Sequence, residues 1–216
     1  VAQFYRVIQK EGRAIPPGEL FRLFHVAWQI GTRDQNISYK EKESEEAVLA
    51  KGRALLKVFQ EEVRTQRIEA VEEPFLVEII DPKSGEVIPY NLVGVFDLVE
   101  SDGDGNLILS ELKTSARRYT DEKAEMSLQG AIYSYALKQL GYTTSSRNTL
   151  IRYDVLLKTK TPSLERHFVV REERDHRRAI SLMKEVLRAI DAEIYYPNPG
   201  WYCTECPFKG ACDRDL

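Results

Sequence analysis

The sequence has little cysteine, no long apolar run and no surplus of basic charge. Only three of its 216 residues are cysteine, and all three stand in the last 14 positions. An odd, clustered set of cysteines is a poor disulfide framework and a better metal site. No apolar run approaches the roughly 18 residues that cross a bilayer, and no signal peptide opens the chain. We therefore expect a cytoplasmic protein with no membrane segment.

The net charge of −3 excludes a uniformly basic protein that coats DNA. It does not exclude a nuclease, because bound cations neutralise the carboxylates of a metal site. Contact with phosphate would then depend on local basic residues, for each of which the alternative is a solvated surface charge. The candidates are Arg6, Lys10 and Arg13 near the start, and Arg117, Arg118 and Lys123 further along.

The chain divides into three regions by pattern. Apolar residues at helical spacing in residues 1–67 predict a helical N-terminal region, with its third helix over Glu45–Arg67. Residues 68–195 switch to strand composition and form the predicted core. Residues 196–216 are an irregular tail that carries the cysteines.

The core begins with a predicted antiparallel meander. Its strands are expected at Ile68–Ile80, Leu92–Val99 and Leu107–Lys113, with a hairpin loop over Asp102–Asn106. A helix over Asp121–Leu140, a strand over Thr149–Lys158 and an amphipathic helix over Glu172–Ile194 follow.

Three polar residues interrupt the apolar strands of the meander. Asp97 sits inside Val93–Val99, and period-two alternation puts Glu111 and Lys113 on one face of the next strand. Buried charges are costly unless they are paired or hold a metal. Two carboxylates and a backbone carbonyl, that of Leu112, are hard ligands suited to Mg²⁺ or Mn²⁺. The alternative is a surface ion pair at a strand end, because a bare D…ExK pattern also arises by chance.

The wider pattern resembles the PD-(D/E)XK nucleases of the RecB type. Gly94-Val95-Phe96-Asp97 matches their G-x-x-D, Glu111-Leu112-Lys113-Thr114 their D/E-x-K-T, and Gln129 to Tyr133 their Q-x-x-x-Y helix. The resemblance implies that Asp97, Glu111 and Lys113 are catalytic, and that Gln129 and Tyr133 face the site. It also makes His25 the candidate for an additional metal ligand.

The cysteine tail has the spacing C-x₂-C-x₅-C, formed by Cys203, Cys206 and Cys212. Structural zinc and iron–sulfur sites usually take four protein ligands, of which three are visible. In the RecB-like branch that includes AddAB-type and CRISPR-associated exonucleases, such a tail binds a [4Fe–4S] cluster, with a fourth cysteine near the N-terminus. The resemblance places that cysteine immediately before Val1. Zinc, or a tail of free thiols, is the alternative.

The resemblance implies a restriction-endonuclease-like α/β fold, with a mixed central sheet flanked by helices and a cysteine-bound C-terminal cap. It implies a Mg²⁺- or Mn²⁺-dependent DNA exonuclease acting on single strands or free ends. Arg117 and Arg118, basic residues just after the proposed site, are the candidates for contact with DNA. A helicase or a CRISPR-adaptation or recombination protein is the expected partner. The alternative function is a catalytically silent nucleic-acid-binding or assembly module of the same fold.

Overall fold

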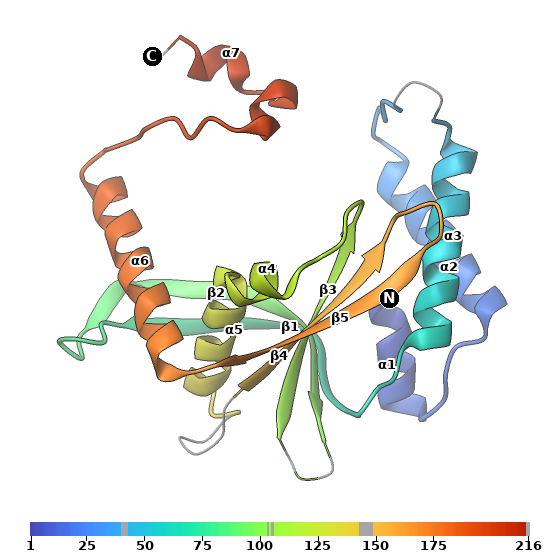
Figure 1. The fold of residues 1–216 in the computed structure, drawn as a ribbon, viewed down its shortest axis with the longest axis horizontal. Helices are drawn as coiled ribbons and strands as arrows, with labels where there is room; N and C mark the ends of the chain where they lie inside the picture. The colour runs from blue at the N-terminus through green and yellow to red at the C-terminus, as the bar shows by residue number, and fades with distance from the viewer. Residues whose placement is uncertain (40–42, 103, 105, 143–148, 215–216) are drawn as a thin grey trace.

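One mixed sheet runs through the middle of the molecule, with helices on both sides (Figure 1). It is seen in a computed structural model that describes residues 1–39, 43–102, 104, 106–142 and 149–214. The strand order is β1-β2-β3-β4-β5, and the β3–β4 pair is parallel while the other neighbours are antiparallel. The predicted α/β class with a mixed sheet flanked by helices is therefore confirmed.

The strands are β1 (Arg67–Ile80), β2 (Val87–Ser101), β3 (Leu107–Ser115), β4 (Thr149–Leu157) and β5 (Ser163–Arg171). The meander of β1, β2 and β3 was predicted, and the β2–β3 turn is closed by the Asp102 N–H donating to the Asn106 carbonyl. Gly103 and Gly105 of that predicted loop lie outside the described residues. The sequence pattern did not predict β5, an edge strand on which Phe168 and Val170 are exposed.

Helices α1 (Ala2–Glu11), α2 (Pro17–Thr32) and α3 (Glu45–Glu62) form the unit on one side of the sheet. The Ser44 hydroxyl caps α3 by accepting the N–H of Ala47. This third helix ends at Glu62, five residues before the predicted Arg67, which is instead the first residue of β1. The buried core of this side is Phe4, Tyr5, Val7, Ile15, Leu20, Leu55, Leu56, Phe59, Val71, Leu98 and Leu156.

Helices α4 (Asp121–Glu125), α5 (Leu128–Gln139) and α6 (Glu173–Asp191) cover the other face. Lys184 of α6 pairs with Asp81 and Asp191 accepts from Tyr90, so both bonds hold α6 to the β1–β2 hairpin. The core on this side includes Phe75, Phe96, Val99, Leu109, Tyr135, Leu137, Ile151, Tyr153, Val155 and Ile180.

The single helix predicted over Asp121–Leu140 is wrong, because α4 ends at Glu125 and α5 begins at Leu128. The interruption has a physical cause in a distant residue. Arg171, at the end of β5, donates to the carbonyls of Ala124 (2.9 Å) and Ser127 (3.1 Å). A charged donor thus adds to the hydrogen bonding of two carbonyls at the junction between the helices, beside the Ser127 N–H that donates to Ala124 at 3.2 Å.

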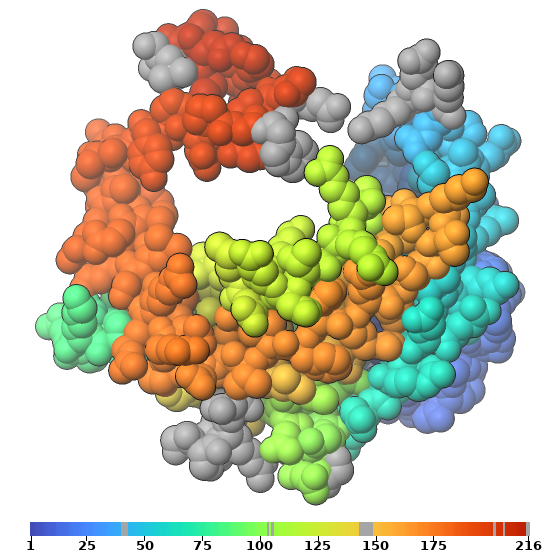
Figure 2. All heavy atoms as spheres, in the orientation of Figure 1, coloured from blue at the N-terminus to red at the C-terminus, as the bar shows by residue number. Residues whose placement is uncertain are grey.

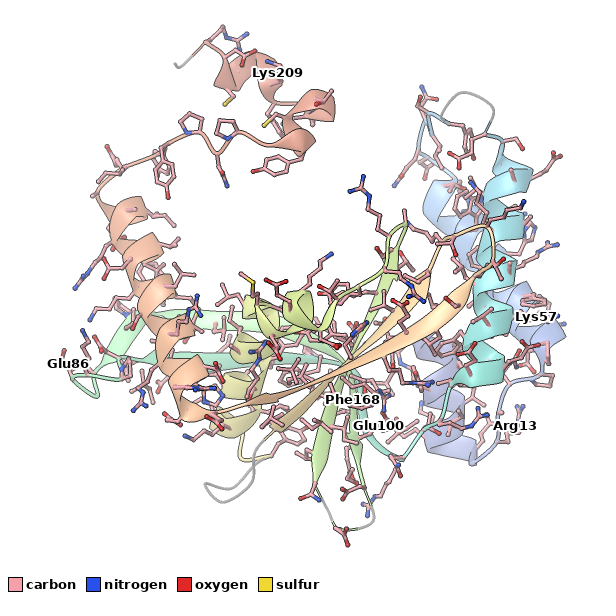
Figure 3. The ribbon with its side chains drawn as sticks, viewed as in Figure 1. Arg13, Lys57, Glu86, Glu100, Phe168 and Lys209 are labelled. Atoms are coloured by element: carbon pink, nitrogen blue, oxygen red, sulfur yellow. The ribbon has the colours of Figure 1, made fainter. Side chains whose placement is uncertain are left out.

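A buried ionic cluster lies between the sheet and the N-terminal helices. The Arg152 guanidinium contacts Glu100 at 2.6 Å and Asp154 at 3.0 Å, and Glu100 is fully buried below the centre of the sheet (Figure 3). Arg166 reaches the other oxygen of Asp154 at 3.3 Å. Because Glu100, Arg152 and Asp154 are buried, removing one of these three is expected to be costly.

The tail continues from α6 into η1 (Trp201–Glu205) and α7 (Lys209–Cys212). In the space-filling view it stands across an open gap from the yellow-green α4 segment (Figure 2). Within the described ranges, no helix is long and apolar enough to cross a membrane.

Candidate active site

Asp97 stands where β2 and β3 part. The backbone ladder between the two strands runs from Ser101–Leu107 to Leu98–Ser110 and ends there. One residue further, the Leu112 N–H donates to Asp97 Oδ2 at 2.9 Å instead of to a β2 carbonyl. The half-buried Asp97 carboxylate therefore lies in the gap between the strands.

Glu111 and Lys113 share the face of β3 that is turned towards α5, as alternation predicted. Glu111 is 7% exposed, and its Oε1 lies 3.1 Å from the Lys113 ammonium. Its second oxygen, Oε2, is buried with no hydrogen-bond partner among the described residues. A buried carboxylate oxygen without a donor is costly, so this atom indicates a place for a cation or a donor from a ligand.

The charge of Asp97 disfavours the ionised form of Glu111. Burial raises the pKa of Glu111, and the charge of Asp97 raises it further against the opposing effects of Lys113 and Gln129. Burial also raises the pKa of Asp97, while the Leu112 N–H and Lys113 lower it. A divalent cation between the two groups would favour their ionised forms.

Gln129 and Tyr133 of α5 contact these residues from the face of the sheet that α5 covers. Lys113 Nζ donates to Gln129 Oε1 at 2.8 Å, and Gln129 Nε2 donates to Glu111 Oε1 at 2.8 Å. Gln129 Nε2 also lies 3.2 Å from the Tyr133 hydroxyl. The amide thus holds the carboxylate and the ammonium in one arrangement. Five of the predicted site residues, Asp97, Glu111, Lys113, Gln129 and Tyr133, are brought together.

Close packing of α5 makes this reach possible. A Cβ on Gly130 would lie 2.6 Å from the Tyr153 hydroxyl and 3.3 Å from Arg171 Nε, so only glycine fits. Tyr153 is fully buried, stacks on Tyr119 and has Lys113 Nζ 5.9 Å from its ring centroid. Sequence reasoning missed Tyr153 as a support of the site, since its position in an apolar strand carried no local signal.

Arg117 and Arg118 are exposed just beyond the end of β3. Arg118 pairs with Glu165 at 3.0 Å, although its side chain is 84% exposed, and such a pair adds little to stability. Both side chains are therefore accessible to a ligand near Lys113. Their predicted contact with DNA stays a prediction.

His25 is not gathered with the carboxylates. It is half-buried on α2, and its Nδ1 has no hydrogen-bond partner in the described part of the chain. Among the described residues, no three His, Cys, Asp or Glu side chains form a group that could hold a metal ion. The reason is that α2 packs on α3, which carries it with the N-terminal unit rather than with β2 and β3. Its role as a ligand stays a prediction.

The three tail cysteines are not gathered either. Cys203 and Cys206 are half-buried, Cys212 is exposed, and all three are free thiols. Cys203 Sγ accepts the N–H of Gly200 at 3.3 Å. Because no three-ligand group is found in the described ranges, this arrangement does not fit an iron–sulfur cluster or a structural zinc ion.

A comparison with protein families gives one match that spans almost the whole chain. The family model of the PD-(D/E)XK nuclease superfamily matches residues 1–213. No curated protein sequence matches at a significant level. Among solved structures, the protein described as SSO0001 is 16% identical over 100% of this chain and 82% of its own, with a TM-score of 0.44. A "putative exonuclease" from Eubacterium rectale is 9% identical over 99% of this chain and 79% of its own, with a TM-score of 0.48. With TM-scores below 0.5, neither likeness adds to the family match.

Proposed function

The chain belongs to the PD-(D/E)XK nuclease superfamily, and from this premise we propose that it is a metal-dependent DNA nuclease. The observation that carries the proposal is the Oε2 of Glu111, which is buried beside a second carboxyl group and a lysine and has no hydrogen-bond partner in the described part of the chain. An ion pair at a strand surface would leave both carboxylate oxygens in water. Here Oε2 of Glu111 is buried and available to bind a cation.

The nucleases of this superfamily generally use Mg²⁺ or Mn²⁺. Asp97, Glu111 and the backbone carbonyl of Leu112 would hold the ion. The N–H and C=O of a strand residue point to the same side, and the Leu112 N–H points to Asp97, so its carbonyl faces the same gap. When bound, the cation supplies charge neutralisation for the scissile phosphate and lowers the pKa of a bound water. His25 is proposed as an additional ligand, on the resemblance alone.

The remaining residues bind and orient. Lys113 offers N–H donors to a phosphate oxygen or to the attacking water, and its direction is set by Glu111 and Gln129. Gln129 donates to the same Oε1 of Glu111 that Lys113 contacts. These two donors fix the orientation of the Glu111 carboxylate. Arg117 and Arg118 are proposed to contact the phosphates that leave the site along the end of β3.

Three substitutions test the assignment. Asp97→Asn, Glu111→Gln and Lys113→Met are each expected to lower kcat for DNA cleavage by about 10²-fold or more. The matched controls are Glu86→Gln, at the tip of the β1–β2 hairpin, and Lys57→Met, on the outer side of α3, since both labelled residues lie away from the site (Figure 3). Cleavage is also expected to stop in EDTA. Full activity of purified Asp97→Asn protein would refute the proposal.

We propose single-stranded DNA with a free end as the substrate, on the resemblance to RecB-like exonucleases. The test uses single strands labelled at the 5′ or the 3′ end, together with a circular single strand and an RNA strand of the same sequence. Mononucleotides or short products from linear DNA alone are the expected result. Cleavage of the circle would show an endonuclease. DNA binding without any metal-dependent cleavage would support the catalytically silent module instead.

The cluster and the partners are proposed on the resemblance and the C-x₂-C-x₅-C spacing. Cys203, Cys206 and Cys212 are proposed to bind a [4Fe–4S] cluster, which requires a tail arrangement other than the one described. Iron and acid-labile sulfide in protein purified without oxygen, lost in Cys206→Ala, would support this; zinc alone would favour the alternative. A helicase or CRISPR-adaptation partner stays a prediction.

A further inference from the structure

Glu72, in the middle of β1, has a backbone conformation that strand residues do not normally adopt. Its φ is +46°, in the left-handed region that disfavours residues with a Cβ. The other described non-glycine residue with positive φ is Glu193, which lies at the end of α6, where a left-handed residue is common. A strained conformation inside a strand persists only where the surrounding structure imposes it, and such residues cluster at functional sites.

The register places Glu72 directly opposite Asp97. In the β1–β2 ladder, Val71 pairs with Leu98 and Glu73 pairs with Phe96. The residues between these two pairs are Glu72 and Asp97, and they do not form a ladder pair themselves. The unusual conformation therefore lies across from one of the two carboxylates of the site.

Both strands change the face that they present at this level. Residues two apart in a strand normally point to the same face. Leu98 packs among the N-terminal helices, yet Phe96 packs under α5. On β1, Val71 packs among the N-terminal helices and Phe75 under α5, although they are four apart. At Glu72 and Asp97 the β1–β2 hairpin therefore turns over, which means that the alternation of side chains between the two faces of the sheet is reversed on both strands.

The turnover explains where the Asp97 carboxylate lies. In a regular strand a side chain stands perpendicular to the sheet and cannot accept an N–H from the neighbouring strand. Asp97 sits at the point where the facing changes, and its Oδ2 does accept the Leu112 N–H, in the gap between β2 and β3. There it accepts the N–H of Leu112, the residue after Glu111, whose Oε2 is buried and has no partner among the described residues.

We propose that Glu72 is a positioning residue of the nuclease site and acts through its left-handed backbone. By turning the β1–β2 hairpin over, it directs Asp97 into the gap beside β3 and so completes the ligand set for the divalent cation. This rests on the proposed function. Arg6 of α1 contacts the Glu72 carboxylate at 2.7 Å, so this exposed side chain is paired with a cation.

The test separates the backbone of Glu72 from its charge. Glycine and asparagine tolerate the left-handed region, alanine tolerates it less, and valine least. We expect Mn²⁺ affinity, measured by titration calorimetry on the full chain, to stay near wild type in Glu72→Gly and Glu72→Asn. In Glu72→Val it should fall by about tenfold or more, as when a residue that orients a ligand is lost. Glu72→Ala should lie between them and serves if the valine variant does not fold.

Two variants act as controls. Glu73→Val changes the neighbouring exposed residue, which pairs regularly in the ladder, and should leave Mn²⁺ affinity unchanged. Glu72→Gln keeps the backbone preference and removes the charge, and should also stay near wild type. Equal losses in Glu72→Gly, Glu72→Gln and Glu72→Val would overturn the proposal, because the carboxylate would then be what matters. Wild-type affinity in a folded Glu72→Val protein would overturn it as well.

A second readout does not depend on metal or on cleavage. The Leu112 amide hydrogen bonds to Asp97 Oδ2, so its hydrogen exchange reports where Asp97 lies. Protection of this amide should persist in Glu72→Gly and be lost in Glu72→Val and in Asp97→Ala. If the wild-type protein fails to cut DNA but shows this pattern, the proposed function fails and the positioning role stands. Unchanged protection of the Leu112 amide in Glu72→Val would refute the positioning role alone.

Discussion

Replacing Gly130 by alanine tests how closely α5 must approach the sheet to place Gln129. The added Cβ would lie 2.6 Å from the Tyr153 hydroxyl, and Tyr153 cannot move aside because its fully buried ring stacks on Tyr119. Overpacking of this kind costs about 1–3 kcal/mol. Alanine offsets up to about 1 kcal/mol of that through its better helix propensity. We expect a net loss of about 0–2 kcal/mol in the free energy of unfolding, measured by urea denaturation.

The effect on activity should exceed the effect on stability. Gln129 precedes Gly130 and holds both Lys113 and Glu111 at 2.8 Å, so a shift of α5 displaces all three groups. A displacement of about 1 Å can cost on the order of 10²-fold in rate. We therefore expect kcat for DNA cleavage to fall by about tenfold or more, under conditions in which Gly130→Ala is fully folded.

Two further variants make the reasoning refutable. Tyr153→Phe removes the nearest atom that the new Cβ would meet, and that hydroxyl has no hydrogen-bond partner among the described residues, so its loss is cheap. The double variant Gly130→Ala/Tyr153→Phe should therefore recover most of the activity and stability. Gly31→Ala is the matched control, because Gly31 lies in α2 and no described residue comes within 4 Å of an added Cβ, so it should gain up to about 1 kcal/mol. Equal behaviour of Gly130→Ala and Gly31→Ala would refute the close packing, and failure of Tyr153→Phe to rescue would refute its stated cause.

Three other outcomes follow from buried groups. Burial lowers the pKa of His176, so the unfolded chain binds a proton below about pH 6.5 that the folded chain does not, and stability falls as pH falls. Between pH 6.5 and 5.5 the wild-type protein should lose up to about 1 kcal/mol more than His176→Gln in urea denaturation, and parallel pH profiles would contradict this. Arg152→Met should cost about 3–5 kcal/mol, because it leaves the fully buried Glu100 without its guanidinium; a loss below about 1 kcal/mol would show that this cluster is dispensable. Mn²⁺ at about 100 times its Kd should stabilise the wild-type protein by about 2.7 kcal/mol and Glu111→Gln much less, as read from thermal denaturation; equal stabilisation would place the ion elsewhere.

The sequence by itself determined the parts of the site that depend on local periodicity. Glu111 and Lys113 share a face because strand side chains alternate, and Gln129 and Tyr133 share a face because they are one helical turn apart. The antiparallel meander followed from three apolar runs separated by turn residues. These features need no information beyond a few neighbouring residues, so the pattern was enough to predict them.

The tertiary structure decided the features that depend on distant partners. The division between α4 and α5 is stabilised by Arg171, more than 40 residues away in the chain, which no helical pattern can reveal. Asp97 lies in the gap beside β3 because the hairpin turns over at Glu72, whose left-handed backbone its own propensity disfavours. Packing of α2 on α3 likewise kept His25 from joining the carboxylates in this arrangement. Residue type and spacing thus predicted which groups belong to the site, whereas long-range packing against the sheet determined which of them come into contact.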